Sequence, residues 1–147
     1  MRKILEINPL ERIIDANINR AKEGLRVCEE ITRFILDSRR LTGEIKKIRH
    51  SIDALVRRLP AAQKLLKARK SLSDVGRTIY GQELKRKNLS DVFFANIKRV
   101  QESIRVLEEF TKLGNSRLAV GFKKIRYESY EIEKKVAAEI SSLRHHR

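Results

Sequence analysis

Apolar residues recur three and four positions apart along most of the chain, which is the spacing of one face of an α-helix. The first stripe predicts a helix over residues 8–37, with Asn8 as its N-cap and Pro9 at its first helical position. The positions of this stripe that we expect to be buried are Ile14, Ile18, Ala21, Leu25, Cys28, Thr32 and Ile35. A second stripe predicts a helix over residues 38–59, which Pro60 ends.

The middle of the chain lacks this regular spacing. A short helix over residues 61–69 leads into residues 71–81, where Ser, Asp and Gly predict the main loop. Helical spacing then resumes. Either Asn88 or Ser90 is placed to cap a third helix, and a fourth helix runs over residues 117–142.

The sequence also contains an internal repeat. Residues 16–32 reappear as residues 95–111 at an offset of 79, with ten identities in seventeen positions. A second match, at an offset of 77, pairs residues 46–50 with residues 123–127. Because each match falls on a different predicted helix, the repeated unit is a helical hairpin.

Two hairpins that each expose one apolar stripe cover each other best when an approximate two-fold axis relates them. We therefore predict an all-α fold, in which two pseudo-two-fold-related hairpins form a four-helix bundle with a short extra helix and a loop between them. Residues 1–147 form one domain, with repeat 1 at about 8–59, the connection at 60–87 and repeat 2 at about 88–143. A solenoid is disfavoured because such arrays need three or more copies.

Composition supports this helical class and indicates the compartment. There are only six Gly and two Pro, the residues that most disfavour a helix interior. Cys28 is the single cysteine, so the chain has neither a disulfide framework nor a thiolate metal cluster, which fits a reducing cytosol. No apolar run reaches the length of a signal peptide or a membrane span, so we expect a cytoplasmic protein without a membrane partner.

The formal net charge of +15 indicates anionic partners. Nucleic acid, acidic lipid and small phosphorylated ligands all satisfy this charge. Nucleic acid is disfavoured because aromatic residues make up only 5% of the chain, Trp is absent and no recognition motif is present.

The repeat copies polar positions as well as apolar ones. At about 100° per residue, Asn17 and Arg20 border the apolar stripe of their helix, as do their counterparts Asn96 and Arg99. An Asn within a helix has poor helical propensity, so keeping it in both copies indicates a hydrogen-bonding task. We expect these four residues to converge on one site, with the Asn side chains binding substrate or nucleotide and both Arg side chains acting in catalysis.

Four further arginines are also copied between the repeats. These additional candidates for binding substrate or nucleotide are Arg26, Arg105, Arg49 and Arg126. The alternative is a ladder of salt bridges between neighbouring helical turns, each contributing about 0.2–0.5 kcal/mol. For Arg26, Glu29 and Glu30 both interpretations stay open.

The loop holds a second group of candidates. Asp74 is placed to bind Mg²⁺, and Gly76 to let the backbone approach a phosphate, with Arg69 just upstream to hold anionic oxygens. A plain turn is the alternative for Ser, Asp and Gly in such a cluster. The Walker sequence and the G-x-G-x-x-G sequence are both absent, which excludes a standard nucleotide-binding loop.

Two Asn-x-x-Arg-x-x-Glu-x-x-Arg-Val ladders that flank one Asp-Val-Gly resemble the monofunctional hydroxymethylpyrimidine phosphate kinase family of thiamine biosynthesis. The resemblance covers nearly the whole chain. The loop pattern of that family has an Arg followed by Asp-Val-Gly-Thr. Arg69 and residues 74–76 match this pattern, whereas Arg77 stands in place of the Thr. Family members occur alone or fused to thiamine phosphate synthase, and this chain is similar to the stand-alone form.

The resemblance implies a phosphotransferase that uses ATP and Mg²⁺. Its acceptor would be 4-amino-5-hydroxymethyl-2-methylpyrimidine phosphate, a small phosphorylated pyrimidine, and its products the diphosphate and ADP. It also implies a functional link to thiamine phosphate synthase. The alternative is a non-catalytic basic helical module that binds nucleic acid or a thiamine-pathway partner. The sequence leaves open whether the protein is a homodimer.

Overall fold

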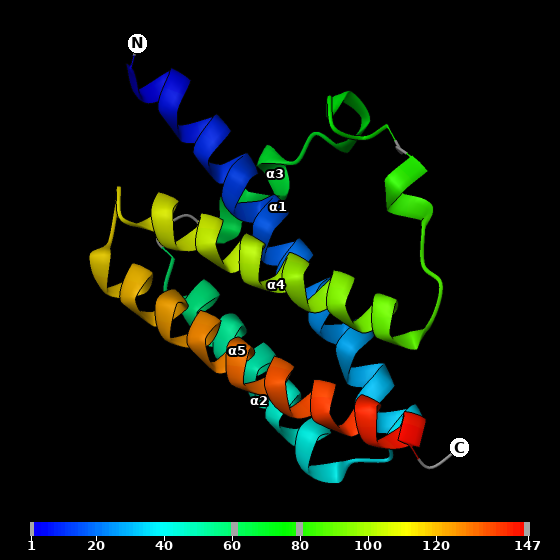
Figure 1. Cartoon of the computed structure of the whole chain (residues 1–147). Coiled ribbons are helices and arrows are strands. Elements are labelled where there is room, and N and C mark those ends of the chain that lie inside the picture. The colour runs from blue at the N-terminus through cyan, green and yellow to red at the C-terminus, as the bar shows by residue number, and fades with distance from the viewer. Residues whose placement is uncertain (1, 60–61, 79–80, 146–147) are drawn as a thin grey trace.

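The computed structural model describes residues 2–59, 62–78 and 81–145 (Figure 1). These residues form helices and turns without a strand, which confirms the predicted all-α class. The elements in chain order are α1 (Arg2–Glu30), the π-helical turn η1 (Ile31–Ile35), α2 (Arg39–Arg57), η2 (Ala62–Lys64), α3 (Leu65–Ala68), η3 (Ser71–Ser73), η4 (Gly81–Leu84), α4 (Leu89–Thr111) and α5 (Ser116–His145).

The four long helices form one bundle. Within each hairpin α1 packs on α2 and α4 on α5, and across the hairpins α1 packs on α4 and α2 on α5. Each helix of repeat 1 therefore contacts its own counterpart in repeat 2, as expected for an approximate two-fold relation. The short helix α3 packs against α1, and the green segment that follows it in Figure 1 arches away from the bundle. A superposition of the two hairpins stays a prediction.

The predicted apolar stripes supply the core. Ala21, Leu25 and Cys28 of the first stripe are fully buried, and Phe93 and Phe122 are the largest fully buried side chains of the second repeat. Burying a side chain of this size stabilises the fold by about 1.5–3 kcal/mol. Burial also raises the pKa of the Cys28 thiol to about 12, so this cysteine packs as a neutral side chain. Across the described part of the chain, the helices include none with the length and apolarity needed to span a membrane.

The ends of the first helix differ from the prediction. Asn8 is not an N-cap, since α1 begins at Arg2 and contains Pro9 in its interior. Residues 3–7 are good helix formers, and Pro keeps a helical φ while losing one backbone hydrogen bond. At the other end η1 replaces the last α-helical turn. A π-helical turn holds more residues than an α-helical one, so Ile35 rotates out of the core and is 50% exposed.

Two other helix boundaries were predicted well. Asn88, rather than Ser90, caps α4, because the Asn88 Oδ1 atom accepts a hydrogen bond from the Asp91 N–H at 2.9 Å. The second helix ends at Arg57, close to the predicted end. Pro60, the residue predicted to stop it, lies outside the described residues.

Helices α1 and α4 approach closely where Gly24 faces α4. A Cβ atom at this position would lie 2.7 Å from the Val100 Cγ2 atom and 2.9 Å from the Asn96 carbonyl oxygen. Any larger side chain would therefore push the two helices apart. Since Arg20 lies one helical turn before Gly24 and Arg99 lies between Asn96 and Val100, this close approach also determines how near the two arginines come.

Candidate anion-binding site

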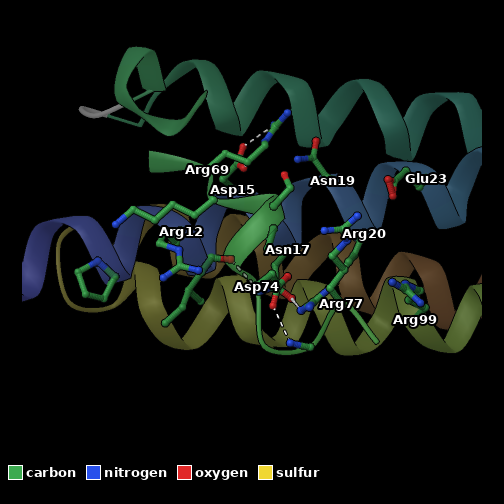
Figure 2. Close-up of a pocket in the computed structure, with 16 residues that line it drawn as sticks. Arg12, Asp15, Asn17, Asn19, Arg20, Glu23, Arg69, Asp74, Arg77 and Arg99 are labelled. Atoms are coloured by element: carbon green, nitrogen blue, oxygen red, sulfur yellow. Dashed lines mark hydrogen bonds and ion pairs between the residues drawn. The ribbon is translucent and has the colours of Figure 1, made fainter. Parts of the chain in front are cut away.

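A cavity of about 670 Å³ lies between α1, residues 69–77 and α4 (Figure 2). Its lining from α1 consists of Pro9, Arg12, Ile13, Asp15, Ala16, Asn17, Asn19, Arg20 and Glu23. The loop contributes Arg69, Lys70, Ser71, Asp74, Gly76 and Arg77, and α4 contributes Arg99. The α1 residues recur at helical spacing on the side of the helix that faces away from the core. The cavity is therefore a covered outer face of α1 rather than a gap in the core.

One ion pair, between the buried Asp15 and the exposed Arg69, holds the start of the loop against this face. The Arg69 Nε atom donates to the Asp15 Oδ2 atom at 2.8 Å, and the Arg69 Nη2 atom donates to the Asp15 Oδ1 atom at 2.9 Å. This two-point contact joins residues 54 positions apart, and Asp15 is only 7% exposed. The hydrogen bond to Asp15, and then its charge, raises the pKa of the Arg69 guanidinium, which stays cationic. No feature of the sequence around Asp15 had indicated this role.

The structure brings together three of the four copied Asn and Arg residues. Asn17, Arg20 and Arg99 line the cavity, whereas Asn96 does not. Asn17 is buried, its Nδ2 atom donates to the Ile13 carbonyl at 2.8 Å, and its Oδ1 atom accepts a long hydrogen bond of 3.4 Å from Arg20. The predicted convergence is wrong for Asn96 because the covering loop exists in one copy and lies over α1.

The hydrogen-bonding task predicted for the two Asn residues is present in both repeats. The Asn96 Nδ2 atom donates to the Val92 carbonyl at 2.7 Å, as Asn17 does to the carbonyl four residues before it. Each bond fixes the amide with its oxygen directed away from that carbonyl. At Asn17 this oxygen faces the cavity arginine Arg20, so the amide is oriented for polar contacts there.

The other four copied arginines are engaged in ion pairs and do not line the cavity. Glu29 binds Arg26 at 3.1 Å and Arg49 at 3.1 Å. The second repeat reproduces this arrangement, with the Glu108 carboxylate 3.3 Å from Arg105 and 2.9 Å from Arg126. Both glutamates are almost fully buried. The salt-bridge interpretation is therefore correct for Arg26 and Glu29, and these clusters join α1 to α2 and α4 to α5.

The Asp74 and Gly76 pair forms a turn at the cavity. The Gly76 N–H donates to the Asp74 Oδ1 atom at 2.8 Å, so this N–H already has an acceptor and does not point to a ligand. Within residues 2–59, 62–78 and 81–145 there is no group of three or more His, Cys, Asp or Glu side chains placed to hold a metal ion. Asp74 is thus not part of such a group among the described residues, and it suits an ion that brings most of its ligands with it.

Charge in the cavity is predominantly positive. Among the described residues that line it, the six cationic side chains of Arg12, Arg20, Arg69, Lys70, Arg77 and Arg99 stand against the three carboxylates of Asp15, Glu23 and Asp74, which leaves a formal charge of +3. Figure 2 shows Arg12 toward one end, and Arg20, Arg77 and Arg99 toward the other. A concave surface with one sign of charge concentrates its field and attracts anions. This arrangement offers two ends for two anionic groups.

The sequence-based prediction missed several of these residues. Arg12 lies two helical turns before Arg20, so the spacing from Arg20 along α1 was a usable signal for it. Arg77 had no such signal, because its place in the cavity depends on where residues 69–77 lie relative to α1. Its guanidinium adds a third arginine to the end that holds Arg20 and Arg99.

Asp15→Asn tests the role of the ion pair. An Asn removes the charge while keeping the shape, so we expect Arg69 to detach and the free energy of unfolding to fall by on the order of 1–3 kcal/mol. Amide hydrogen exchange of residues 69–77 should become faster, whereas that of α4 should not change. The matched control is Asp53→Asn, which breaks the more exposed Lys22–Asp53 pair of 2.7 Å and should cost no more than about 0.5 kcal/mol. Unchanged exchange in residues 69–77 would show that other contacts hold the loop.

The fold and the cavity define a small helical-bundle protein with a covered cationic site. Comparison with known proteins makes this specific: residues 12–135 match the ThiD2 family, and the chain belongs to that family. It is 40% identical over 126 residues to a thiamine-phosphate synthase of Synechocystis, covering 84% of this chain and 35% of the relative. It is 41% identical over 131 residues to a thiamine-phosphate synthase of Rhodopirellula baltica, covering 86% of this chain and 35% of the relative.

The chain thus spans about a third of the length of the curated relatives it matches. A more distant thiamine-phosphate synthase, from Gloeobacter violaceus, shows the same proportion, with 35% identity over 88% of this chain and 37% of the relative. No solved structure matches the chain. Family membership supports the predicted resemblance at the level of the ThiD2 family.

Proposed function

We propose that this protein acts in thiamine biosynthesis and transfers the γ-phosphoryl group of ATP to 4-amino-5-hydroxymethyl-2-methylpyrimidine phosphate. The observation that carries the proposal is the cavity over α1, where five arginines and a lysine surround a space large enough for two phosphorylated ligands to meet. Membership of the ThiD2 family and the names of the thiamine-phosphate synthase relatives support the pathway.

The cavity suits a reaction between two anions. An oxygen of the acceptor phosphate attacks the γ-phosphorus, the bond from that phosphorus to the bridging oxygen of ADP breaks, and the diphosphate and ADP are formed. Because the attacking oxygen is already anionic, no general base is needed. The protein has to hold the two phosphates in line and to offset their mutual repulsion, which is what fixed cationic side chains provide.

We assign the two ends of the cavity to the two ligands. Arg20, Arg77 and Arg99 would hold the phosphates between which the group is transferred. The Arg20 guanidinium is oriented by the hydrogen bond that it donates to the Asn17 side chain. Arg12, at the other end, would hold the remaining phosphates, and Lys70, which also lines the cavity, would add its charge. Arg69 is tied to Asp15 through two of its donors, so it positions the loop and contributes its charge to the field rather than a full phosphate contact.

Asp74 fits a Mg²⁺ ion of the kind that nucleotides carry. Such an ion keeps several waters and needs only one or two protein carboxylates besides the substrate phosphates. The Asp74 Oδ2 atom, which is not the oxygen that accepts the turn bond from Gly76, would supply one such ligand. Bound there, the ion would offset charge on the transferred phosphoryl group.

The test is turnover by the purified chain with Mg²⁺-ATP and the pyrimidine monophosphate, with ADP and the diphosphate quantified by chromatography. We expect both products in equal amounts. The unphosphorylated alcohol should react with a kcat/KM lower by about 100-fold or more, because it leaves cationic side chains without their anion. Comparable turnover of the alcohol would show that the acceptor phosphate is not recognised.

One alternative has an observation in its favour. The relatives are named for thiamine-phosphate synthase and this chain corresponds to only a third of each, so it could act as a non-catalytic module that binds a phosphorylated intermediate or a thiamine-pathway partner. Absence of turnover combined with tight binding of the pyrimidine monophosphate, measured by calorimetry, would favour this alternative. Binding of nucleic acid in place of both ligands would favour the nucleic-acid interpretation of the net charge.

A further inference from the structure

A second cavity, of about 270 Å³, lies at the end of the bundle where α4 turns into α5. Its walls are apolar and include Ile14, Leu65, Phe110 and Leu118. The two cavities share no lining residue, although Glu11 lies one helical turn before Asp15 on α1. This cavity is therefore separate from the anion-binding site, and ligand binding in it does not depend on the proposed reaction.

Among the described residues that line the second cavity, Glu11 is the one that is ionisable. It is only 7% exposed, although it sits among apolar neighbours. Within residues 9–59, 62–78 and 83–143, the Glu11 carboxylate has no hydrogen-bond or ion-pair partner. The Thr111 hydroxyl, which also lines the cavity, already donates to the Leu107 carbonyl at 2.6 Å.

The other buried carboxylates of the described chain are all paired. Asp15 binds Arg69, Glu29 binds Arg49, and Glu108 binds Arg126. These pairs follow the general rule that a buried charge is stabilised by a partner of opposite sign. Glu11 is the exception to a pattern that this protein otherwise keeps, and it is also the one of the four that lines an apolar cavity.

We propose that the second cavity binds a small, flat organic cation, with Glu11 as the carboxylate that pairs with it. The ligand must fill an apolar space and carry a positive charge, and an amidinium or a protonated amine on a single ring does both. The ring would replace water against the leucines and Phe110, and the cation would pair with Glu11. The cavity volume of about 270 Å³ limits the ligand to about one ring with a short substituent. An anion would be repelled by Glu11, so the two cavities of this protein select ligands of opposite charge.

Benzamidine is the probe for this site, and benzamide is its neutral counterpart of nearly the same shape. Methyl NMR on the full chain should show saturable shifts for Ile14, Leu65 and Leu118 on addition of benzamidine. Glu11→Gln should weaken this binding at least tenfold, and benzamide should bind the unchanged protein at least tenfold more weakly than benzamidine. The matched control is Glu30→Gln, an exposed carboxylate on the same helix, which should bind benzamidine as the unchanged protein does.

The same variant gives a measurement that needs no ligand. Because Glu11→Gln removes a charge that has no partner among the described side chains, it should melt at the same temperature as the unchanged protein or higher. A melting temperature lower by several degrees would mean that Glu11 is already stabilised, and would overturn the proposal. Benzamidine shifts that are absent from the cavity methyls, that appear only around Asp74, or that survive Glu11→Gln would overturn it too. Glu11→Asp keeps the charge and should retain measurable benzamidine binding, which separates loss of the cation from loss of the fold.

Discussion

Arg20→Ala and Arg99→Ala are each expected to lower kcat/KM for phosphoryl transfer by tenfold or more, with the melting temperature nearly unchanged. Each guanidinium lines the cavity from its own repeat, and neither forms an ion pair within the described residues. Loss of a charge-assisted contact to phosphate costs about 1.5–3 kcal/mol. The measurement is steady-state kinetics with the pyrimidine monophosphate, together with thermal unfolding followed by circular dichroism.

Lys98→Ala is the matched control for Arg99. Lys98 is the adjacent cation on α4 and is exposed, yet it does not line the cavity, so its removal lowers the net charge equally without removing a phosphate contact. Its kcat/KM should fall by less than about twofold. If Arg20→Ala and Arg99→Ala retain the turnover of the Lys98→Ala variant, the transfer site lies elsewhere, and the Arg12 end of the cavity becomes the place to search.

Gly24→Ala should destabilise the bundle by about 1–3 kcal/mol, although Ala is the better helix former. The added methyl would sit 2.7 Å from the Val100 Cγ2 atom and 2.9 Å from the Asn96 backbone oxygen, and the backbone cannot yield without moving α4. Since Arg20 and Arg99 flank this contact, kcat/KM should fall as well. Chemical denaturation gives the first effect and steady-state kinetics the second.

Gly43→Ala should change the stability of the protein in the opposite direction to Gly24→Ala. Gly43 is exposed within α2, and a Cβ atom there would meet nothing within 4 Å. This substitution should stabilise the fold by about 0.5–1 kcal/mol, because it only reduces the freedom of the unfolded chain and improves helical propensity. Equal stability of the two variants would mean that α1 and α4 are less tightly packed than the described geometry requires.

The charged residues copied between the repeats divide into two sets, one that holds each hairpin together and one that lines the cavity. Glu29 and Glu108, each with two arginines, occupy equivalent places inside their hairpins, and such a contact can be duplicated with the hairpin itself. Arg20 and Arg99 instead meet at a cavity that forms once. Duplication therefore preserved the hairpin structure in both copies, whereas the single covering loop made one face of the bundle different from the other.

Local patterns in the amino-acid sequence were enough to define the helices, the repeat and the pairing of apolar stripes. Helical spacing is local, so residues such as Leu25 and Ile45 were recognisable as core positions, and the Asn88 cap was readable from its own neighbours. Local rules failed at Pro9 and at Ile35. In both places a helix continued or changed its pitch for reasons of packing that no short segment contains.

Which charged residues form a site depended on tertiary packing. Arg26 and Arg20 look alike in the sequence, but a buried Glu29 holds Arg26 in the hairpin while Arg20 is left facing the cavity. Asp15 and Arg69 are 54 residues apart, and Glu11 differs from the paired carboxylates only through what surrounds it. Charge and hydrogen-bonding capacity are properties of the residue, whereas partner and burial come from segments distant in the chain, so the sites of this protein depended on how α1 is covered on its two faces.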